Sequence, residues 1–531
     1  MHFHLPKWVL FAFALSTSFA ALAAPPPGFD QRVEQLRIAF GVPGVSIAIV
    51  EDGHTTLARG WGVRRIGAAD QVDADTIFGT GSTGKAFTTA ALAVLVDQGK
   101  LGWDDKVIDR MPDFRMWDPW VTREMTVRDL LVHRSGLGPG AGDLLFFPNS
   151  NLSRKESVRR LRYIKPATSF RSGFAYDNVL FMVAGQLIEE VSGETWEKFV
   201  RGHVLGPLDM NHATVSDAEY AATPNRAHPH SRSGGGIVGL GPQQPVDEGT
   251  TLSANVAPAG GLSISANEMT HWLLTQLGHG KAPGAATRLY SEAQAEEMWN
   301  PVTIEPIDPP LPQFTVFKPN FLAYALGWEV RDYRGTMVVW HGGAVPGSLT
   351  WVVLVPSKNV GLFIAINSED FELANGLKDE LLDHYLGLPP GQWPEKIHTY
   401  NLGRLGDVAK EVAKKSSSPA IAGPSLSLDH YAGDYADPWF GTIKVRRSGA
   451  SLDIEFPHST GMSGPLTHYQ RDTFRTNPTQ HWIEPAFVTF ALDPAGKVSR
   501  VTMLPVSPSA DFSFDFQDLD FAPVVAAAAA H

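Results

Sequence analysis

The sequence contains no cysteine among its 531 residues. This absence excludes a disulfide framework, a cysteine nucleophile and a thiolate metal site. The chain also has no basic run, and its formal net charge is −12 at pH 7. It therefore offers no electrostatic surface for nucleic acid. We find no internal repeat and expect neither a cofactor nor a metal. A content of 43% hydrophobic and 19% charged residues is that of a globular protein, long enough for two or three domains.

Long apolar runs are missing everywhere except at the N-terminus. There, Lys7 precedes the apolar run from Trp8 to Ala14, and Ala21-Leu22-Ala23 occupies the position of a signal cleavage site. We predict a signal peptide over residues 1–23 and an exported, periplasmic protein; the alternative is an uncleaved anchor. No later stretch approaches the ~18 apolar residues of a spanning helix, so we expect no stable membrane insertion after cleavage.

The most informative stretch is residues 79–96, where a glycine-rich segment is followed by apolar residues at helical spacing. Ser82 falls at the predicted helix N-terminus, and Lys85 lies one turn further along the same face. The amine can therefore meet the Ser82 hydroxyl. Because burial lowers the pKa of a lysine, this pair has the properties of a nucleophile beside its base.

Three other interpretations of this stretch compete. The spacing from Gly79 to Lys85 matches a phosphate-binding loop, but that motif needs Ser or Thr next and the sequence has Ala86. A nucleophile elbow would need glycine in place of Thr80. The third interpretation is a helix cap with a solvated lysine. About one or two Ser-x-x-Lys motifs arise by chance in such a chain, so the motif needs support from elsewhere.

One supporting segment is Tyr176-Asp177-Asn178, just before a predicted helix. A tyrosine hydroxyl near a lysine ammonium can lose its proton and act as a base. Asn178 can hold the carbonyl of a substrate, cap its helix, or do both. The plain alternative for Tyr176 is a core tyrosine at the end of a loop.

A second supporting segment is Trp340-His341-Gly342-Gly343-Ala344, at the end of a predicted strand. The two glycines let a substrate backbone lie close to the strand edge, and they free the N–H of Ala344 for an oxyanion. The alternative is a simple turn with an incidental histidine.

The rest of the chain divides into a mixed part and a β-rich part. We predict helices at 31–40, 126–132, 178–193, 265–277 and 371–386, a hairpin at 45–63, and strands at 324–331, 336–341, 349–355 and 360–366. Residues 228–245 read as a loop, in which we take His228 and His230 as loop residues rather than metal ligands. The predicted divisions are a domain at 24–400, a polar linker at 401–425, an antiparallel β domain at 426–522 and a disordered tail at 523–531.

These motifs, in this order, resemble those of the serine β-lactamase-like hydrolases. That group includes class C β-lactamases, family VIII carboxylesterases, D-aminopeptidases and D-alanyl-D-alanine carboxypeptidases. Leu130 to Leu137 is similar to the group's "LLxHxSGL" segment, Pro258 to Leu262 to its "AGGL" turn, and Trp340 to Gly347 to its "HxGxxPG" strand end. The resemblance covers Phe29 to Leu388. It implies an α+β fold with an antiparallel sheet flanked by helices, followed by a small all-β barrel or sandwich.

The resemblance also implies roles for the singled-out residues. Ser82 would be the acylated nucleophile, and Lys85 would bridge Ser82 and Tyr176. Tyr176 would relay the proton to the leaving group, and Asn178 would position the substrate carbonyl. Each role matches a residue of the required type in this sequence.

The strand end would supply the oxyanion hole. The N–H groups of Ser82 and Ala344 would form it, beside Gly342 and Gly343, while His341 would sit behind the tyrosine and add positive potential when protonated. Class C β-lactamases carry lysine where this chain has His341. A histidine is mostly neutral at pH 7, so we do not expect efficient β-lactam hydrolysis.

We therefore predict an exported serine hydrolase that acts through an acyl-enzyme on Ser82. We favour a peptidase that cleaves small or unusual linear peptides. One alternative is a carboxylesterase of short-chain esters with little β-lactamase activity, and another is a non-catalytic penicillin-recognising sensor or scaffold. The predicted partner is a small peptide or ester, and the sequence leaves the oligomeric state open. Loop aromatic residues are candidates to line a broad apolar cleft: Trp117, Trp120, Phe146, Phe147, Phe314 and Phe317.

Overall fold

The computed structural model describes residues 25–246, 253–417 and 422–524. The predicted signal peptide and nearly all of the predicted disordered tail lie outside these residues. Within them, no helix combines the length and the apolar character that a membrane crossing requires.

The N-terminal domain is built on an eight-stranded antiparallel sheet with the order β2-β1-β12-β11-β10-β9-β8-β7. Its strands are β1 (Gly44–Glu51), β2 (His54–Gly62), β7 (Thr303–Ile304), β8 (Leu322–Tyr324), β9 (Glu329–Tyr333), β10 (Thr336–Val345), β11 (Ser348–Val355) and β12 (Val360–Ile366). The sequence predicted the last three. Its run at 324–331 proves to be two strands, β8 and β9, separated by a turn.

The predicted hairpin is confirmed as β1 and β2. Asp52 and Gly53 join them with φ angles of 47° and 81°, the positive values that a two-residue turn of this hand needs. β1 is buried along its whole length. Its alternate residues Ile47 and Ile49 contribute to one apolar core, and Ala48 and Val50 to the other. The continuous apolar run therefore reflects a strand covered on both faces.

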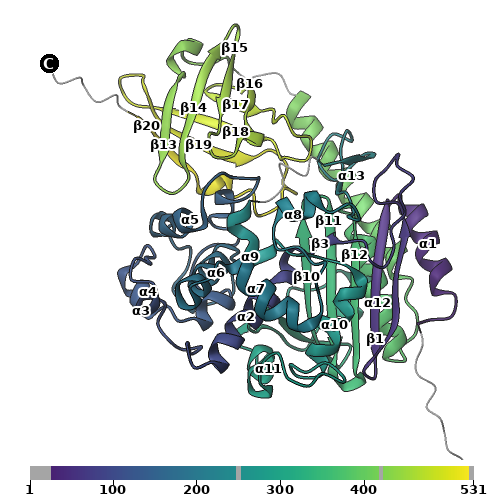
Figure 1. Cartoon of the computed structure of the whole chain (residues 1–531). Helices are drawn as coiled ribbons and strands as arrows, with labels where there is room; N and C mark the ends of the chain where they lie inside the picture. The colour runs from purple at the N-terminus through teal and green to yellow at the C-terminus, as the bar shows by residue number, and fades with distance from the viewer. Residues whose placement is uncertain (1–24, 247–252, 418–421, 525–531) are drawn as a thin grey trace, which may run out of the picture.

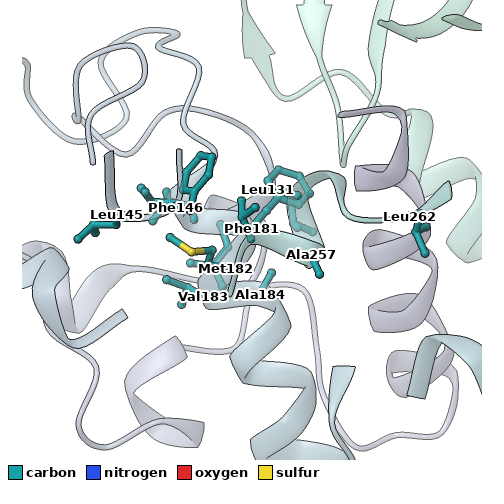
Figure 2. Close-up of a cluster of buried hydrophobic side chains, with 14 of the residues drawn as sticks. Leu131, Leu145, Phe146, Phe181, Met182, Val183, Ala184, Ala257 and Leu262 are labelled. Atoms are coloured by element: carbon teal, nitrogen blue, oxygen red, sulfur yellow. The ribbon is translucent and has the colours of Figure 1, made fainter. Parts of the chain in front are cut away.

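Helices cover the two faces of this sheet (Figure 1). On one face, α1 (Phe29–Phe40) and α12 (Phe371–Tyr385) pack against the sheet, and α13 (Trp393–Ser417) packs on α12. On the other face lie α2 (Lys85–Asp97), α6 (Val179–Ser192), α9 (Ala257–Gly260) and α10 (Ala266–Leu277). Figure 2 shows part of this second core, in which Phe181, Met182, Val183 and Ala184 of α6 lie near Leu131, Leu145, Phe146, Ala257 and Leu262.

Shorter elements complete the domain. They are α3 (Val107–Arg110), α4 (Pro119–Glu124), α5 (Arg154–Arg160), α7 (Trp196–Val200), α8 (Asp217–Ala222), α11 (Glu292–Trp299), β3 (Phe78–Gly79), β6 (Ser263–Ile264), β4 (His230–Arg232) and β5 (Gln243–Pro245). The region expected as a loop at 228–245 thus contains a small hairpin. The predicted helix at 126–132 is a 3₁₀ turn at Arg128–Leu131, in which Thr126 and Asp129 exchange the predicted capping hydrogen bonds.

The predicted linker at 401–425 is helical over most of its length, because α13 continues to Ser417. Its polar character belongs to the solvent face, where the Lys410–Asp407 and Lys415–Glu411 pairs lie. Leu405 and Val412 on its other face are buried and join a small apolar cluster with Val506 of the C-terminal domain. The helix is therefore a packed connection rather than an extended linker.

The C-terminal domain is a closed barrel of eight antiparallel strands, not a sandwich. The strands are β13 (Gly433–Asp437), β14 (Gly441–Ser448), β15 (Ser451–Glu455), β16 (Gly464–Gln470), β17 (Thr473–Thr476), β18 (Ala486–Leu492), β19 (Val498–Pro505) and β20 (Asp520–Pro523). Each pairs with the next, and β20 returns to β13. Figure 1 shows this barrel stacked on the N-terminal domain, with a yellow segment at their junction.

Candidate active site

Ser82 lies in a tight 3₁₀ turn, Gly81–Gly84, that runs directly into α2. Gly81 has a φ of +52°, and a side chain on it would place a Cβ atom 2.6 Å from the backbone nitrogen of Ala344. Glycine is therefore required for the turn to approach β10. Thr80 anchors the turn by donating from Oγ1 to the carbonyl of Leu262 at 2.8 Å. Ser82 thus takes the predicted position at the start of the helix.

Lys85 is fully buried and hydrogen-bonded to three groups. Its Nζ lies 2.9 Å from Ser82 Oγ, 2.7 Å from Asn178 Oδ1 and 3.1 Å from the carbonyl of Ala259. Burial lowers the pKa of Lys85 to about 7, although the charge of Asp143 opposes this shift. The carbonyl oxygens of Asn178 and Ala259 can only accept. A neutral amine therefore donates its two N–H bonds to them and presents its lone pair to the Ser82 hydroxyl.

Asn178 connects Lys85 to a buried carboxylate. Its Nδ2 donates to Asp143 Oδ2 at 2.9 Å, and Ser513 of the barrel domain donates from Oγ to the same oxygen at 2.8 Å. Burial raises the pKa of Asp143 to about 7, with both hydrogen bonds opposing the shift. Asn178 makes no capping bond to α6, so the capping alternative is wrong. No local pattern in the sequence marked Asp143 or Ser513.

Tyr176 is close to the pair but does not complete the expected bridge. Lys85 Nζ lies over its ring, 4.9 Å from the centroid. The Tyr176 hydroxyl is buried and has no hydrogen-bond partner among the described residues. Burial raises the pKa of this hydroxyl, and its proximity to Ser82 only partly opposes the rise. In this structure Tyr176 is therefore a protonated group beside Ser82, and the buried amine of Lys85 is the candidate base.

His133, which stands in the segment 130–137, supports Tyr176 from behind. The two rings pack with centroids 4.2 Å apart, and His133 Nδ1 accepts from the backbone N–H of Asp177 at 3.0 Å. Burial lowers the pKa of His133. The imidazole is therefore a neutral packing partner that fixes the position of the tyrosine ring.

His341 lies on β10, where the sequence placed it, but it is neutral. Its Nδ1 donates to the carbonyl of Gly342 at 2.6 Å, so its Nε2 accepts from the Tyr324 hydroxyl at 2.7 Å. Burial lowers the pKa of His341 to about 3, and the charge of Lys85 adds to this shift. The positive potential that a protonated His341 would add is therefore absent near neutral pH, as its ordinary pKa already indicated.

The strand end at Gly342, Gly343 and Ala344 contacts the nucleophile turn. β10 pairs with β9 only as far as Trp340, so one edge of residues 341–345 has no partner in β9. A Cβ atom on Gly343 would lie 2.0 Å from the carbonyl oxygen of Thr80 and 3.1 Å from the nitrogen of Ser82. The backbones of Ser82 and Ala344 are thus adjacent, the placement that the predicted oxyanion hole needs.

Seven of the eight predicted site residues line one cavity of about 870 Å³: Ser82, Tyr176, Asn178, His341, Gly342, Gly343 and Ala344. Lys85 lies beneath them. Among the predicted aromatic residues, Phe146 and Phe147 line this cavity. Trp117 and Trp120 are exposed elsewhere, while Phe314 and Phe317 pack on each other and on residues such as Trp393.

The barrel domain forms one wall of the same cavity. It contributes Trp482, Phe512 and Phe514 to the lining, and the Phe512 ring lies 6.0 Å from that of Tyr176. Asp515 fixes this segment to the catalytic domain. Its carboxylate accepts the backbone N–H groups of Gly142 at 2.7 Å and Leu144 at 3.1 Å.

The described residues contain no group of three or more side chains placed to hold a metal. In particular, both ring nitrogens of His230 are used. Nδ1 donates to the carbonyl of Asn367 at 3.0 Å, and Nε2 accepts from the N–H of Ile66 at 3.1 Å. His230 of this hairpin therefore holds neighbouring backbone groups together.

A comparison with protein families assigns most of the chain. The family described as Beta-lactamase matches residues 29–387, which is more than half of the sequence. The chain belongs to the Beta-lactamase family. A second match, to a domain of unknown function (DUF3471), spans residues 417–523 and so contains the barrel.

Curated relatives are similar over most of the chain. The unguisins hydrolase ungD' of Aspergillus campestris is 27% identical over 435 residues, covering 78% of this chain and 77% of the relative. The unguisins hydrolase ungD of Aspergillus violaceofuscus is 25% identical over 518 residues, covering 88% and 86%. Among solved structures, the octameric penicillin-binding protein homologue from Pyrococcus abyssi superposes with a TM-score of 0.58 at 20% identity, over 90% of this chain and 98% of the other. That likeness shows the shared fold of this Beta-lactamase family member.

Proposed function

We propose that this protein is a serine hydrolase that forms an acyl-enzyme on Ser82 and cleaves amide bonds in small or unusual linear peptides. The observation that carries this proposal is the hydrogen bond of 2.9 Å between Lys85 Nζ and Ser82 Oγ. It joins a hydroxyl to a buried amine whose pKa lies near neutrality. A base with such a pKa is suited to proton transfer at physiological pH.

In the first step, Ser82 Oγ attacks the substrate carbonyl carbon while its proton moves to Lys85 Nζ. The carbonyl oxygen becomes an oxyanion, which the N–H groups of Ser82 and Ala344 can receive. The carbon–nitrogen bond then breaks, and the proton passes from Lys85 to the leaving nitrogen, directly or through the Tyr176 hydroxyl. Water attacks the resulting ester on Ser82 and releases the carboxylic acid, which restores the free serine.

The free edge of β10 supports a peptide substrate. An extended peptide can pair with residues 341–345 beyond the end of β9, because unpaired strand edges bind peptides through backbone hydrogen bonds. A cavity of about 870 Å³ has room for several residues. The names of the two Aspergillus relatives also describe them as hydrolases.

A carboxylesterase is the second candidate function. The aromatic lining favours it, since Phe146, Phe147, Phe512 and Phe514 offer an apolar surface for an acyl chain. β-Lactams are poorer candidates, because the neutral His341 supplies no cation for their carboxylate. The intact Ser82–Lys85 pair argues against a purely non-catalytic sensor.

The test compares wild-type protein with Ser82→Ala on three substrates. These are a p-nitrophenyl short-chain ester, a chromogenic cephalosporin, and short linear peptides with and without D-residues. We expect peptide cleavage by wild-type protein and its loss in Ser82→Ala. Ser499→Ala, on the exposed surface of β19, is the matched control and should retain activity. Ester turnover without peptide cleavage would establish the carboxylesterase instead. No Ser82-dependent turnover of any substrate would reject both enzymatic proposals.

A further inference from the structure

Three of the six carboxylates that line the cavity come from loops where the barrel meets the catalytic domain. Glu484 lies in the loop between β17 and β18, and Asp511 lies in the segment after β19. Glu369 comes from the opposite side, in the turn between β12 and α12. All three line the same cavity as Ser82, so a ligand of Ser82 can reach them.

Glu484 is the unusual member of this group. It is 5% exposed, and its Oε2 is buried without a hydrogen-bond partner among the described residues. Burial raises the pKa of Glu484 to about 7. The charges of Asp511 and Glu369 add to this shift, while that of Arg475 opposes it. A buried polar atom without a partner carries a large desolvation cost, which a bound ligand of opposite charge would offset.

The arginine and histidine side chains that line the cavity hydrogen-bond to groups other than these three carboxylates. Arg232 pairs with Asp370 at 2.6 Å, and His398 lies 2.9 Å from Glu372. Arg404 donates to Asn401.

The other two carboxylates accept hydrogen bonds from neutral groups. Glu369 accepts from the N–H of Gly347 at 2.9 Å and from the hydroxyl of Ser231 at 2.8 Å. Asp511 accepts from the N–H of Ser513 at 2.9 Å and is exposed to the cavity. This corner therefore gathers three carboxyl groups, none of which forms an ion pair with a described residue, and burial raises the pKa of Glu369 as it does that of Glu484.

We infer that Glu484, Asp511 and Glu369 form a subsite that binds a primary ammonium group of the substrate. An ammonium carries three N–H donors and no acceptor, which suits a corner of the cavity that three carboxyl-bearing residues from three loops line. Both the N-terminal ammonium of a peptide and a lysine side chain have this chemistry. The inference rests on the proposed function, because it assigns a substrate preference to the same cavity.

The experiment measures binding to full-length Ser82→Ala protein by calorimetry, so that it does not depend on turnover. The probes are three tetrapeptides: one with a free N-terminus and no lysine, its N-acetylated form, and an N-acetylated form with one lysine. We expect at least one ammonium-bearing peptide to bind about 10-fold or more tightly than the acetylated peptide without lysine. The peptide that gains affinity identifies the source of the ammonium.

Variants made in the Ser82→Ala background show which carboxylates cause the preference for an ammonium group. Glu484→Gln keeps the shape of the side chain but removes its charge, and should abolish the difference in affinity between the ammonium-bearing and the acetylated peptides. Asp511→Asn should reduce it, and because Asp511 is exposed, this variant tests the subsite even if Glu484→Gln folds poorly. Glu455→Gln, on the exposed surface of β15, is the matched control and should leave the difference unchanged.

Two results would overturn the subsite. One is equal binding, or no binding, of all three peptides; the other is a preference for ammonium that persists in both Glu484→Gln and Asp511→Asn. Failure of the proposed function looks different, because wild-type protein would then cleave no substrate in a Ser82-dependent way. If the wild type cleaves free and acetylated peptides equally well, the hydrolase proposal stands and the subsite fails.

Discussion

Ser513 of the barrel domain donates from Oγ to Asp143 Oδ2 of the catalytic domain at 2.8 Å. Asp143 accepts in turn from Asn178, whose amide oxygen accepts from Lys85. The amine of Lys85 is in turn hydrogen-bonded to the Ser82 hydroxyl. A continuous path of hydrogen bonds therefore runs from the C-terminal domain to Ser82, and the barrel helps to position the site as well as forming one wall of its cavity.

The protonation of Lys85 should set the pH dependence of activity. Lys85 must be neutral to accept the Ser82 proton, and its pKa is about 7. We therefore expect kcat/KM to rise with pH through this value and to level off above it. Lys85→Met should lower kcat/KM by ~10²–10⁴-fold, the usual contribution of a general base. Rates measured between roughly pH 5 and 9 test this, with Lys497→Met on the exposed barrel surface as control. A flat profile across neutrality would contradict the assignment.

Asp143 should set the pH at which kcat/KM rises. Its negative charge raises the pKa of Lys85, so Asp143→Asn should lower the Lys85 pKa and move the acidic limb of kcat/KM to lower pH. Ser513→Ala removes a hydrogen bond that holds the pKa of Asp143 down. It should therefore shift the limb in the same direction by a smaller amount. Asp109→Asn, an exposed carboxylate on α3, serves as the control. A shift of the limb to higher pH in Asp143→Asn would refute this account.

Gly343 should tolerate no side chain. A Cβ atom there would lie 2.0 Å from the carbonyl oxygen of Thr80 and 2.5 Å from Thr350 Oγ1. Gly343→Ala would therefore push β10 away from the Ser82 turn and separate the two oxyanion donors. We expect a loss of ~100-fold or more in kcat, the typical effect of losing one such donor.

Gly342→Ala is the matched control for this prediction. Its Cβ atom would meet the Trp351 ring at 3.1 Å, a contact that a small movement of the ring relieves. The loss of kcat should therefore be much smaller. Thermal unfolding of both variants separates a local effect on the site from a general loss of stability, and equal losses of kcat would count against the oxyanion role of this strand end.

The placement of Ser82 beside Lys85 was predictable because local sequence determines the spacing of these two residues. Ser82 and Lys85 are one helical turn apart, and Gly342 and Gly343 stand at a strand end that the β pattern predicts. The hairpin β1–β2 follows equally from a turn dipeptide between two β-rich runs. Such features depend on neighbours in the chain, so the sequence contains the information that places them.

Other features depend on contacts between distant segments. Asp143 and Ser513 are separated by 370 residues, and nothing in either segment indicates the other. The burial that lowers the pKa of His341 to about 3 is likewise reported by no local pattern. The helix within the predicted linker was missed because its buried residues, such as Leu405 and Val412, are few and face the barrel. Tertiary packing decides these features, and sequence patterns alone do not encode it in a readable form.

Asp515 should couple the stability of the two domains to activity. Its buried carboxylate accepts the N–H groups of Gly142 and Leu144, on either side of Asp143. Asp515→Ala leaves both donors unpaired, and each buried unpaired donor costs ~1–3 kcal/mol of folding free energy. We expect a lower free energy of unfolding in urea and a lower kcat/KM, because the loop that positions Asp143 loses its anchor. Asp518→Ala, an exposed carboxylate in the following 3₁₀ turn, should change neither. In the double variant with Asp143→Asn, the loss of kcat/KM should be less than the product of the single losses, since both act through Asp143. If Asp515→Ala behaves like Asp518→Ala, the barrel does not support the catalytic network through this contact.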